Sequence, residues 1–502
     1  MTKNGSPVGS KVLGGVLLNA GGMIFIRCLS LINIAILGRL LSPDDFGVVA
    51  LAMVVVGFLE ALTNNQFETA LIRQKDADHT HYGTAFVLAL LVGCIGAICI
   101  FSLAGPLAVF FNMPDLKAPL QALAVVPLLA GLRNPHFVER EKALNFNPRV
   151  TLSMTSRLSL SVVAITCAIV LVNYWALIWG TITMYVVHML MSYALAPRLP
   201  RPSLQHWRAF LGFGGWLTGA GALDFMNRRL PAALLGRLSG AFQTGLYQVG
   251  SEIATTMTQQ LLTPLHNAIF PGLMAVSQDR ARLSQAYLLV QQSLLGLAMP
   301  VGCGIALIAP ELVRVALGTQ WMPVVPIIAV LSPITAVTAL IVGVQAVVFI
   351  EGDTRALFLR NLLIFVFLLP MAIAGFQLFG MMGLVAAQGA ALLLNTLLTL
   401  RLGARATDTA LLSPVLVAYR SHLAVAGMII ALLALEQVLG RTVATTPMNA
   451  ASLSLGLKIL LGAVVCCSVQ YVLWCQAGRP DGFEQRMLGL LERIWARVRR
   501  PA

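Results

Sequence analysis

The sequence predicts an all-α polytopic membrane protein with about 14 transmembrane helices. The chain has 502 residues, of which 58% are hydrophobic and only 11% are charged. Its mean hydropathy of +0.83 lies far outside the balance of a soluble globular protein. Long apolar windows recur between short polar connections, and positive charges gather in alternate connections. These observations together favour a helical bundle that crosses the membrane many times.

Fourteen apolar windows are bounded by charged residues, Pro and Gly, and each is close to or above the ~20 residues that a spanning helix needs. They cover approximately residues 12–37, 44–71, 83–111, 116–133, 150–172, 174–196, 209–235, 242–265, 284–309, 322–350, 357–377, 379–401, 417–439 and 448–475. The first window is longer than the apolar core of a signal peptide, which has about 7–15 residues, so we expect it to remain as a span.

The Lys and Arg residues support this count, because positive charge gathers on the cytoplasmic side of a membrane. With the N-terminus inside, 24 of the 34, Arg360 among them, fall in cytoplasmic segments or at the window ends beside them, 5 fall in or beside outer connections, and 5 lie deeper within the windows. An even number of spans places both termini on one side. The sequence therefore predicts cytoplasmic N- and C-termini.

The net charge of +14 is explained by this topology and by attraction to anionic lipid headgroups. We therefore expect membrane lipids, and no nucleic acid, among the partners. The segment EQRMLGLLERIWARVRR, residues 484–500, places apolar side chains on one helical stripe and arginines opposite. This pattern predicts a basic amphipathic helix on the inner leaflet, and the alternative is a solvated tail without a docking site.

An offset of 198 residues aligns the first window with the seventh without a gap. It sets AILGRLLSPDDFG, residues 35–47, on ALLGRLSGAFQTG, residues 233–245. Six spans separate the copies, so both run through the membrane in the same direction, as in a parallel repeat. We expect one six-helix bundle in residues 1–205, a second in 206–405, two further helices in 406–476 and a basic cytoplasmic tail in 477–502.

The repeated segment indicates the corner between two helices. Ser42 suits an N-cap, Pro43 the first helical position, and Asp44 and Asp45 the first turn, where negative charge complements the helix dipole. Arg39, like its counterpart Arg237, is expected at the outer end of its span. The favoured interpretation of both arginines is structural, although Arg39 could also meet the aspartates or a lipid phosphate.

Three arginines lie where lipid would be expected. Arg27 is about ten residues, or roughly 15 Å, from either polar edge of its window. A central arginine that faced lipid would cost about 3 kcal/mol, so Arg27 should face a polar or hydrated interior. Arg228 and Arg229 are adjacent in the seventh window, and Asp224 lies one turn before Arg228. Under the 198-residue offset Arg27 corresponds to Phe225, so we expect all three arginines to face one central cleft.

The same window contains Pro231, which removes a helical hydrogen bond to the carbonyl of Asn227 and should loosen the helix there. Arg157 and Lys458 also lie within windows, but closer to the helix ends. For these two we expect snorkelling or packing contacts.

Acidic and amide side chains form a stripe in the second window. Glu60, Asn64 and Glu68 are spaced four residues apart on one helical face. The stripe suits a cavity wall, and Glu60, Glu68, Asp224 and Glu252 are candidates for ion coupling. The alternative is a buried hydrogen-bond network between helices.

The eight cysteines lie in or beside apolar windows without metal-like spacing, so they are interpreted as packing residues. The longest connection, residues 131–149, contains no evident catalytic pair. The sequence therefore predicts neither a metal site nor a cofactor, and it predicts a protein that is not an enzyme.

These features carry a family resemblance. The six-plus-six-plus-two arrangement, GRLLSPDDFGVVALAMVVVGFLE at the second window, ALIRQKDADHTHYGTAF after it, and ALLGRL leading into TGLYQVGSEIATT resemble the polysaccharide flippases. That family belongs to the multidrug/oligosaccharidyl-lipid/polysaccharide exporter superfamily and includes the O-antigen and exopolysaccharide flippases of bacteria.

The resemblance implies translocation of an undecaprenyl-pyrophosphate-linked oligosaccharide across the bacterial inner membrane for lipopolysaccharide or exopolysaccharide biosynthesis. It also implies polysaccharide polymerase and export machinery as partners. Arg27, Arg228 and Arg229 would bind the diphosphate, since guanidinium groups bind phosphate bidentately. Two alternatives stay open: a cation-coupled multidrug exporter of the same superfamily, and a membrane-bound polysaccharide polymerase or ligase.

Overall fold

The computed structural model describes residues 7–73, 78–142, 147–196, 198–208, 215–260, 269–270, 272–351, 354–439, 448–479 and 485. Over these residues the chain is helical and contains no strand. Eight of the described helices are long and apolar enough to cross a membrane. The chain divides into two compact units: unit 1 is 1–249 with 357–365, and unit 2 is 250–356 with 366–502. Each unit is described separately.

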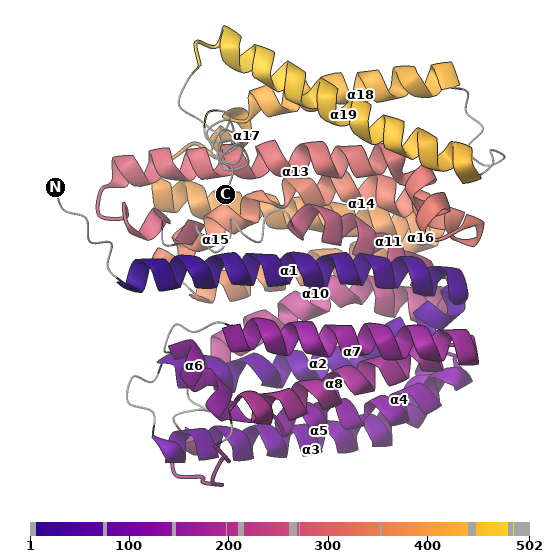
Figure 1. The fold of residues 1–502 in the computed structure, drawn as a ribbon, viewed down its shortest axis with the longest axis vertical. Coiled ribbons are helices and arrows are strands. Elements are labelled where there is room, and N and C mark those ends of the chain that lie inside the picture. The colour runs from indigo at the N-terminus through magenta and orange to yellow at the C-terminus, as the bar shows by residue number, and fades with distance from the viewer. Residues whose placement is uncertain are drawn as a thin grey trace, which may run out of the picture. The chain divides into compact units, whose positions relative to one another are not determined.

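Unit 1 is built from long helices that follow the predicted windows (Figure 1). They are α1 (Pro7–Leu40), α2 (Pro43–Arg73), α3 (His79–Phe110), α7 (Asn147–Leu171), α8 (Trp175–Leu195), α10 (Gly215–Ser239) and the first half of α11 (Ala241–Gln260). Shorter helices connect them: η1 (Pro114–Leu116), α4 (Lys117–Leu123), α5 (Val125–Gly131), η2 (Pro135–Phe137) and α6 (Val138–Lys142). Helix α7 packs on α1 and α8, α3 packs on α5, and α10 packs on α2.

Unit 2 contains the rest of α11 and the C-terminal helices. These are α13 (Arg280–Ala316), η3 (Thr319–Val324), α14 (Val325–Val337), α15 (Leu340–Glu351), α16 (Thr354–Thr407, of which residues 357–365 belong to unit 1), α17 (Ser413–Leu416), α18 (Tyr419–Leu439) and α19 (Met448–Gln476). Helix α13 packs against α14, α18 and α19, which makes it the centre of this unit.

Two windows expected as single spans are interrupted. The window at 116–133 consists of α4 and α5, which meet at Ala124. Pro127 has no N–H to donate to the carbonyl of Leu123, so one regular helix cannot continue through this point. The window at 322–350 consists of η3, α14 and α15 in succession.

Helix α16 reverses direction at Gly380, between the windows predicted at 357–377 and 379–401. Gly380 has a non-helical backbone with φ of +59°, a conformation that glycine adopts without a Cβ clash. A Cβ on Gly375 would lie 2.6 Å from the carbonyl oxygen of Gly383. In a straight helix these residues would be about 12 Å apart, so the contact requires a hairpin. The predicted boundary between these two spans is confirmed.

The corner between α1 and α2 has the predicted cap. The backbone N–H and the hydroxyl of Ser42 donate to Asp45 Oδ2 at 2.9 and 2.6 Å, and the Asp45 N–H donates back to Ser42 Oγ at 3.3 Å. Pro43 is the first residue of α2. At the corresponding corner between α10 and α11, the Arg237 guanidinium lies over the Phe110 ring at 5.5 Å.

The two copies of this corner contact each other within unit 1. A Cβ on Gly47 would collide with the carbonyl oxygen of Ala241, at the start of α11. A Cβ on Gly245 would collide with the carbonyl oxygen of Pro43, at the start of α2. Gly47 and Gly245 are the pair that the 198-residue offset aligns. Each glycine therefore allows the backbone of the other copy to approach closely.

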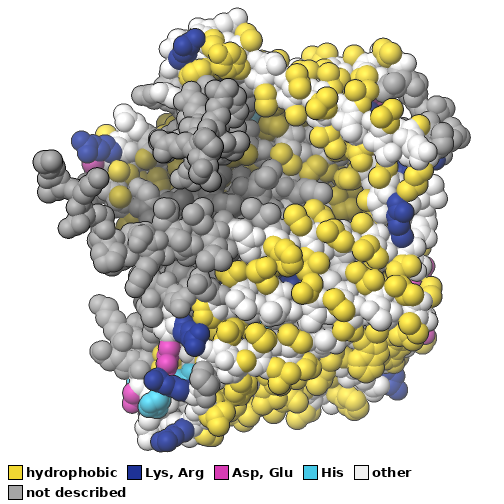
Figure 2. All heavy atoms as spheres, in the orientation of Figure 1, with side chains coloured by type: hydrophobic (Ala, Val, Ile, Leu, Met, Phe, Trp, Pro, Cys, Tyr) yellow, Lys and Arg dark blue, Asp and Glu magenta, His cyan; other side chains and the backbone are white. Residues whose placement is uncertain are grey.

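The outer surfaces of the described helices are apolar. Figure 2 shows hydrophobic side chains spread over the helices, with most charged side chains near helix ends. In α3, Ile95 and Ile98 are 60% and 67% exposed, which suits contact with lipid. Of the eight free cysteines, Cys303 and Cys466 lie buried in an apolar cluster of unit 2 with Met428 and Leu432. The predicted amphipathic helix at 484–500 lies outside the described residues apart from Gln485.

Candidate functional site

Helix α10 carries the main polar group of unit 1. Arg228 Nε donates to Asp224 Oδ2 at 3.0 Å, and this pair is open, since 68% of the Arg228 side chain and 39% of the Asp224 side chain are exposed. Arg229 Nη1 donates to Gln248 Oε1 of α11 at 3.1 Å. The helix stays continuous through Pro231. The structure therefore places the predicted pair Arg228 and Arg229 on one helix within a polar group.

A third arginine that the sequence analysis missed joins this group. Arg360 of α16 is buried and donates to Asn361 Oδ1 through Nε at 3.3 Å and Nη2 at 3.1 Å. The backbone carbonyl of Asn361 accepts from Asn227 Nδ2 at 3.0 Å, which connects α16 to α10. Arg360 lies within electrostatic range of Asp224 and Arg228. The charge count assigned Arg360 to the edge of a cytoplasmic connection, and in the structure it lies within α16.

We name Asp224, Arg228, Arg229 and Arg360 the arginine group. It combines three guanidinium groups with the carboxylate of Asp224, and the guanidinium of Arg228 is the most exposed part described. Phe58 and Phe225 pack beside it with ring centroids 6.4 Å apart, which joins α2 to α10. Arg27 lies in α1, but its side chain is outside the described residues, so its membership of the group stays a prediction.

A second polar group surrounds helix α8. The Tyr185 hydroxyl donates to Glu60 Oε2 of α2 at 2.9 Å. Arg133 is within electrostatic range of Glu60, and Arg133, Arg149 and Arg157 are within range of His188. Glu60 is thus placed in a contact between helices. The side chains of Asn64 and Glu68 lie outside the described residues.

In unit 2, Glu252 of α11 accepts a hydrogen bond from the Thr256 hydroxyl at 3.0 Å, one turn later on the same helix. The Thr335 hydroxyl of α14 donates to the nearby carbonyl of Ala254 at 3.1 Å, which fixes α11 against α14. Glu252 is half-buried in this setting.

The sequence analysis missed the partner of Lys458. Lys458 Nζ of α19 donates to Glu311 Oε1 of α13 at 2.6 Å, and at most 3% of either side chain is exposed. The pair lies beside an apolar groove of about 880 Å³ between α13, α18 and α19. Lys458 therefore makes a packing contact, which is one of the two roles expected for it.

The two arrangements suit different chemistry. The buried pair in unit 2 has balanced charge and joins two helices. The arginine group in unit 1 has an exposed guanidinium at Arg228, and guanidinium groups bind phosphate or carboxylate through paired N–H donors. It can bind an anionic group, and it contains no arrangement for covalent catalysis among the described residues.

Comparison with known proteins gives the family. The model of the polysaccharide biosynthesis protein family matches residues 36–326. The succinoglycan biosynthesis transport protein ExoT of Rhizobium meliloti is 27% identical over 61% of this chain and 62% of its own length, which is less than two thirds. The lipopolysaccharide biosynthesis protein WzxC of Escherichia coli is 21% identical over 78% of this chain and 80% of its own length.

Solved structures agree on the fold. Lipid II flippase MurJ in an inward closed conformation has a TM-score of 0.73 and 13% identity, covering 92% of this chain and all of its own. A point mutant of the Vibrio cholerae MATE transporter VcmN has a TM-score of 0.55 and 14% identity, covering 80% of this chain and 98% of its own. At these identities the likeness concerns the fold alone. Because the family model matches more than half of the sequence, this multi-pass membrane chain belongs to the polysaccharide biosynthesis protein family.

Proposed function

We propose that this protein is a flippase that moves an undecaprenyl-pyrophosphate-linked oligosaccharide from the inner to the outer leaflet of the bacterial inner membrane. The observation that carries the proposal is in the arginine group of unit 1, where 68% of the Arg228 side chain is exposed and Arg229 is the next residue on α10. Guanidinium groups bind phosphate through paired N–H donors. A diphosphate offers phosphate oxygens to both.

The rest of the substrate fits the surrounding chemistry. The sugar chain needs hydrogen-bonding walls, and Gln248, Glu60 and Tyr185 belong to the polar groups of unit 1. The prenyl tail can stay in lipid, beside the apolar outer faces of the helices. Relatives named for succinoglycan and lipopolysaccharide biosynthesis support a saccharide cargo.

Translocation is proposed to occur by alternating access between two six-helix bundles in parallel repeat, with two helices appended. The reciprocal approach of Gly47 and Gly245 supports the repeat, because repeat-related residues contact each other's corner. The diphosphate would dock on Arg228, Arg229 and Arg27 while the protein is open to the cytoplasm. Rocking of the bundles would then expose it outside. Glu60, Glu68 or Glu252 could bind a coupling ion.

Both termini are proposed to be cytoplasmic, and a polysaccharide polymerase and export machinery are proposed to receive the product. The second candidate is a cation-coupled multidrug exporter, favoured by the acidic side chains of Glu60, Asp224 and Glu252. The three arginines argue against it, because they would repel a cationic drug.

The test is deletion of the gene in its native host, followed by lipid extraction and measurement of surface polysaccharide. We expect undecaprenyl-linked oligosaccharide to accumulate on the inner leaflet and surface polysaccharide to fall, both reversed by the wild-type gene. An unchanged lipid pool together with increased drug sensitivity would instead identify the exporter.

A further inference from the structure

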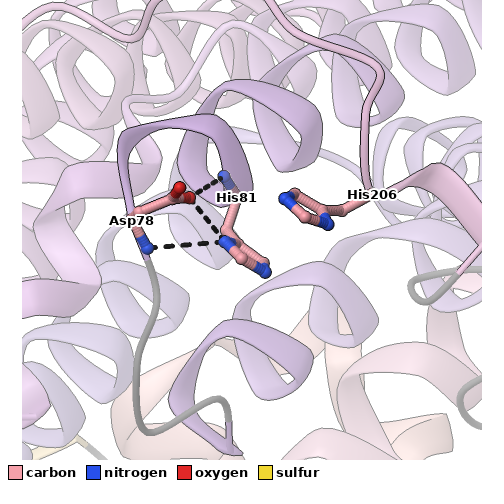
Figure 3. Close-up of side chains that lie close together, drawn as sticks. All are labelled: Asp78, His81 and His206. Carbon is pink, nitrogen blue, oxygen red and sulfur yellow. Dashed lines mark hydrogen bonds and ion pairs between the residues drawn. The ribbon is translucent and has the colours of Figure 1, made fainter.

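Four of the seven histidines gather where α3 begins, among residues that the proposed function does not use. Tyr82 stacks on His136 with centroids 4.6 Å apart, and His79 lies 5.7 Å from His136. His81 stacks on His206 at 3.8 Å with an angle of 7° between the rings. Figure 3 shows His81 with Asp78 on one side and His206 on the other.

Three of these side chains bring metal-ligand atoms together. Asp78 is the N-cap of α3, and its Oδ1 lies 2.6 Å from His81 Nδ1. His206 comes from residues 198–208, which lead toward α10, and its Nε2 lies 3.0 Å from the hydroxyl of Thr80. One donor atom from each of Asp78, His81 and His206 lies within 4.8 Å of the other two.

The position of His206 follows from a set of contacts along its own segment. Asn134 Nδ2 donates to the carbonyls of Ala196 and Arg198 at 2.6 and 2.9 Å. Arg198 Nη1 donates to Glu139 Oε2 at 3.2 Å. The absence of a Cβ on Gly83 lets the carbonyl of Arg201 approach α3. The segment is therefore fastened to α3 and η2 before it reaches His206.

We propose that Asp78, His81 and His206 form a binding site for a divalent transition metal ion of the zinc type. Two imidazoles and one carboxylate, with water as the fourth ligand, are a donor set that Zn²⁺ accepts. Donors around a tetrahedral zinc ion are about 3.4 Å apart, given bonds of about 2.0–2.2 Å. Donor atoms that lie up to 4.8 Å apart need to approach by about 1.4 Å at most, and Asp78 Oδ1 and His81 Nδ1, now 2.6 Å apart, need to separate by about 0.8 Å.

The local chemistry supports ligation by each group. The Thr80 hydroxyl and the His81 N–H donate to Asp78 Oδ1 at 2.7 and 3.1 Å, which fixes the orientation of the carboxylate. The Asp78 side chain is 59% exposed and His206 is half-buried, so an ion can reach them. Because the two rings are nearly parallel and stacked, the nitrogen lone pairs of His81 and His206 lie in two separate planes and do not converge on one point. Ligation therefore requires a turn of the His206 ring, which its largely exposed segment permits.

The test measures Zn²⁺ affinity of the purified full-length protein in lipid nanodiscs by competition with a chromophoric chelator. We expect the wild type to bind one Zn²⁺ at this site, and His206→Gln and His81→Gln to weaken binding at least about 10-fold. Asp78→Asn should weaken it while preserving the N-cap, because Asn also caps helices. His206→Cys should retain binding, since thiolate ligates zinc.

The matched control is His422→Gln, at a histidine of α18 whose Nδ1 lies 2.7 Å from the carbonyl of Ala418. It should bind as the wild type does. Limited trypsin digestion gives a second measurement: Zn²⁺ should protect the bonds after Arg198 and Arg208 in the wild type and not in His206→Gln. Equal Zn²⁺ affinity of wild type and His206→Gln, or no wild-type binding at micromolar Zn²⁺, would overturn the proposal.

Discussion

The cation Lys458 of unit 2 and the arginine group of unit 1 lie in different environments. In unit 2, Lys458 is buried, and its charge is balanced by Glu311 at 2.6 Å. In unit 1, Arg228 pairs with Asp224 but 68% of its side chain is exposed, and Arg229 donates to Gln248. A buried pair serves to join helices. An exposed guanidinium is available to a ligand, so exposure distinguishes a packing contact from a binding site.

The largest expected effect comes from breaking the balanced pair. Lys458→Met leaves the Glu311 carboxylate buried without its charge partner, which should lower the free energy of unfolding by about 3–5 kcal/mol. The double variant Lys458→Met with Glu311→Leu should recover most of this loss, because an apolar pair replaces an ionic one. Thermal unfolding of the purified proteins in detergent measures both.

The control for this cycle is Lys117→Met, at an exposed lysine that begins α4, which should change stability by no more than about 0.5 kcal/mol. If Lys458→Met were as stable as the wild type, the pair would not be what fastens α19 to α13.

The next effect concerns transport rather than stability. The double variant Arg228→Gln with Arg229→Gln removes charge-assisted hydrogen bonds that are each worth about 1.5–3 kcal/mol. Export of surface polysaccharide in the deletion host should fall at least about 10-fold, with an unchanged amount of protein in the membrane. Arg237→Gln, at the arginine that lies over Phe110, is the matched control and should export normally. Wild-type export by the double variant would contradict the diphosphate role.

The smallest effect should come from Asp224→Asn. The ion pair of Asp224 with Arg228 is exposed, and exposed pairs contribute only about 0–1 kcal/mol. The free energy of unfolding should therefore change by less than about 1 kcal/mol. Export should be retained, because the arginine group becomes more positive. A loss of several kcal/mol would show that this pair behaves like Glu311 with Lys458, and the distinction between the units would fail.

Local features were predictable from the sequence. The Ser42 cap follows from short-range hydrogen-bond preferences, and the start of α2 at Pro43 follows from the missing N–H of proline. The boundary at Gly380 follows from the length of the apolar segment, since α16 has 54 residues and a bilayer accepts about 20. Arg228 and Arg229 lie well inside the apolar window 209–235, so their position on one helix could be predicted.

Long-range partners could not be predicted. Glu311 and Lys458 are separated by 147 residues, and neither has a neighbour in sequence that signals the pairing. Arg360 lies close to a window end, so a charge count alone assigns it to a connection, although it lies within electrostatic range of Asp224 and Arg228 on α10. Backbone contacts of Ala196, Arg198 and Arg201 bring His81 and His206 together, and no periodicity in the sequence encodes these contacts.

Gly47 and Gly245 make the two repeated corners depend on each other. The carbonyl of Ala241 leaves no space for a side chain at Gly47, and the carbonyl of Pro43 leaves none at Gly245. A single-residue insertion in either corner would move a glycine away from the carbonyl it accommodates and bring a Cβ against it. The number of residues in one corner therefore cannot change independently of the other. An insertion tolerated in one corner should require a compensating insertion in the other.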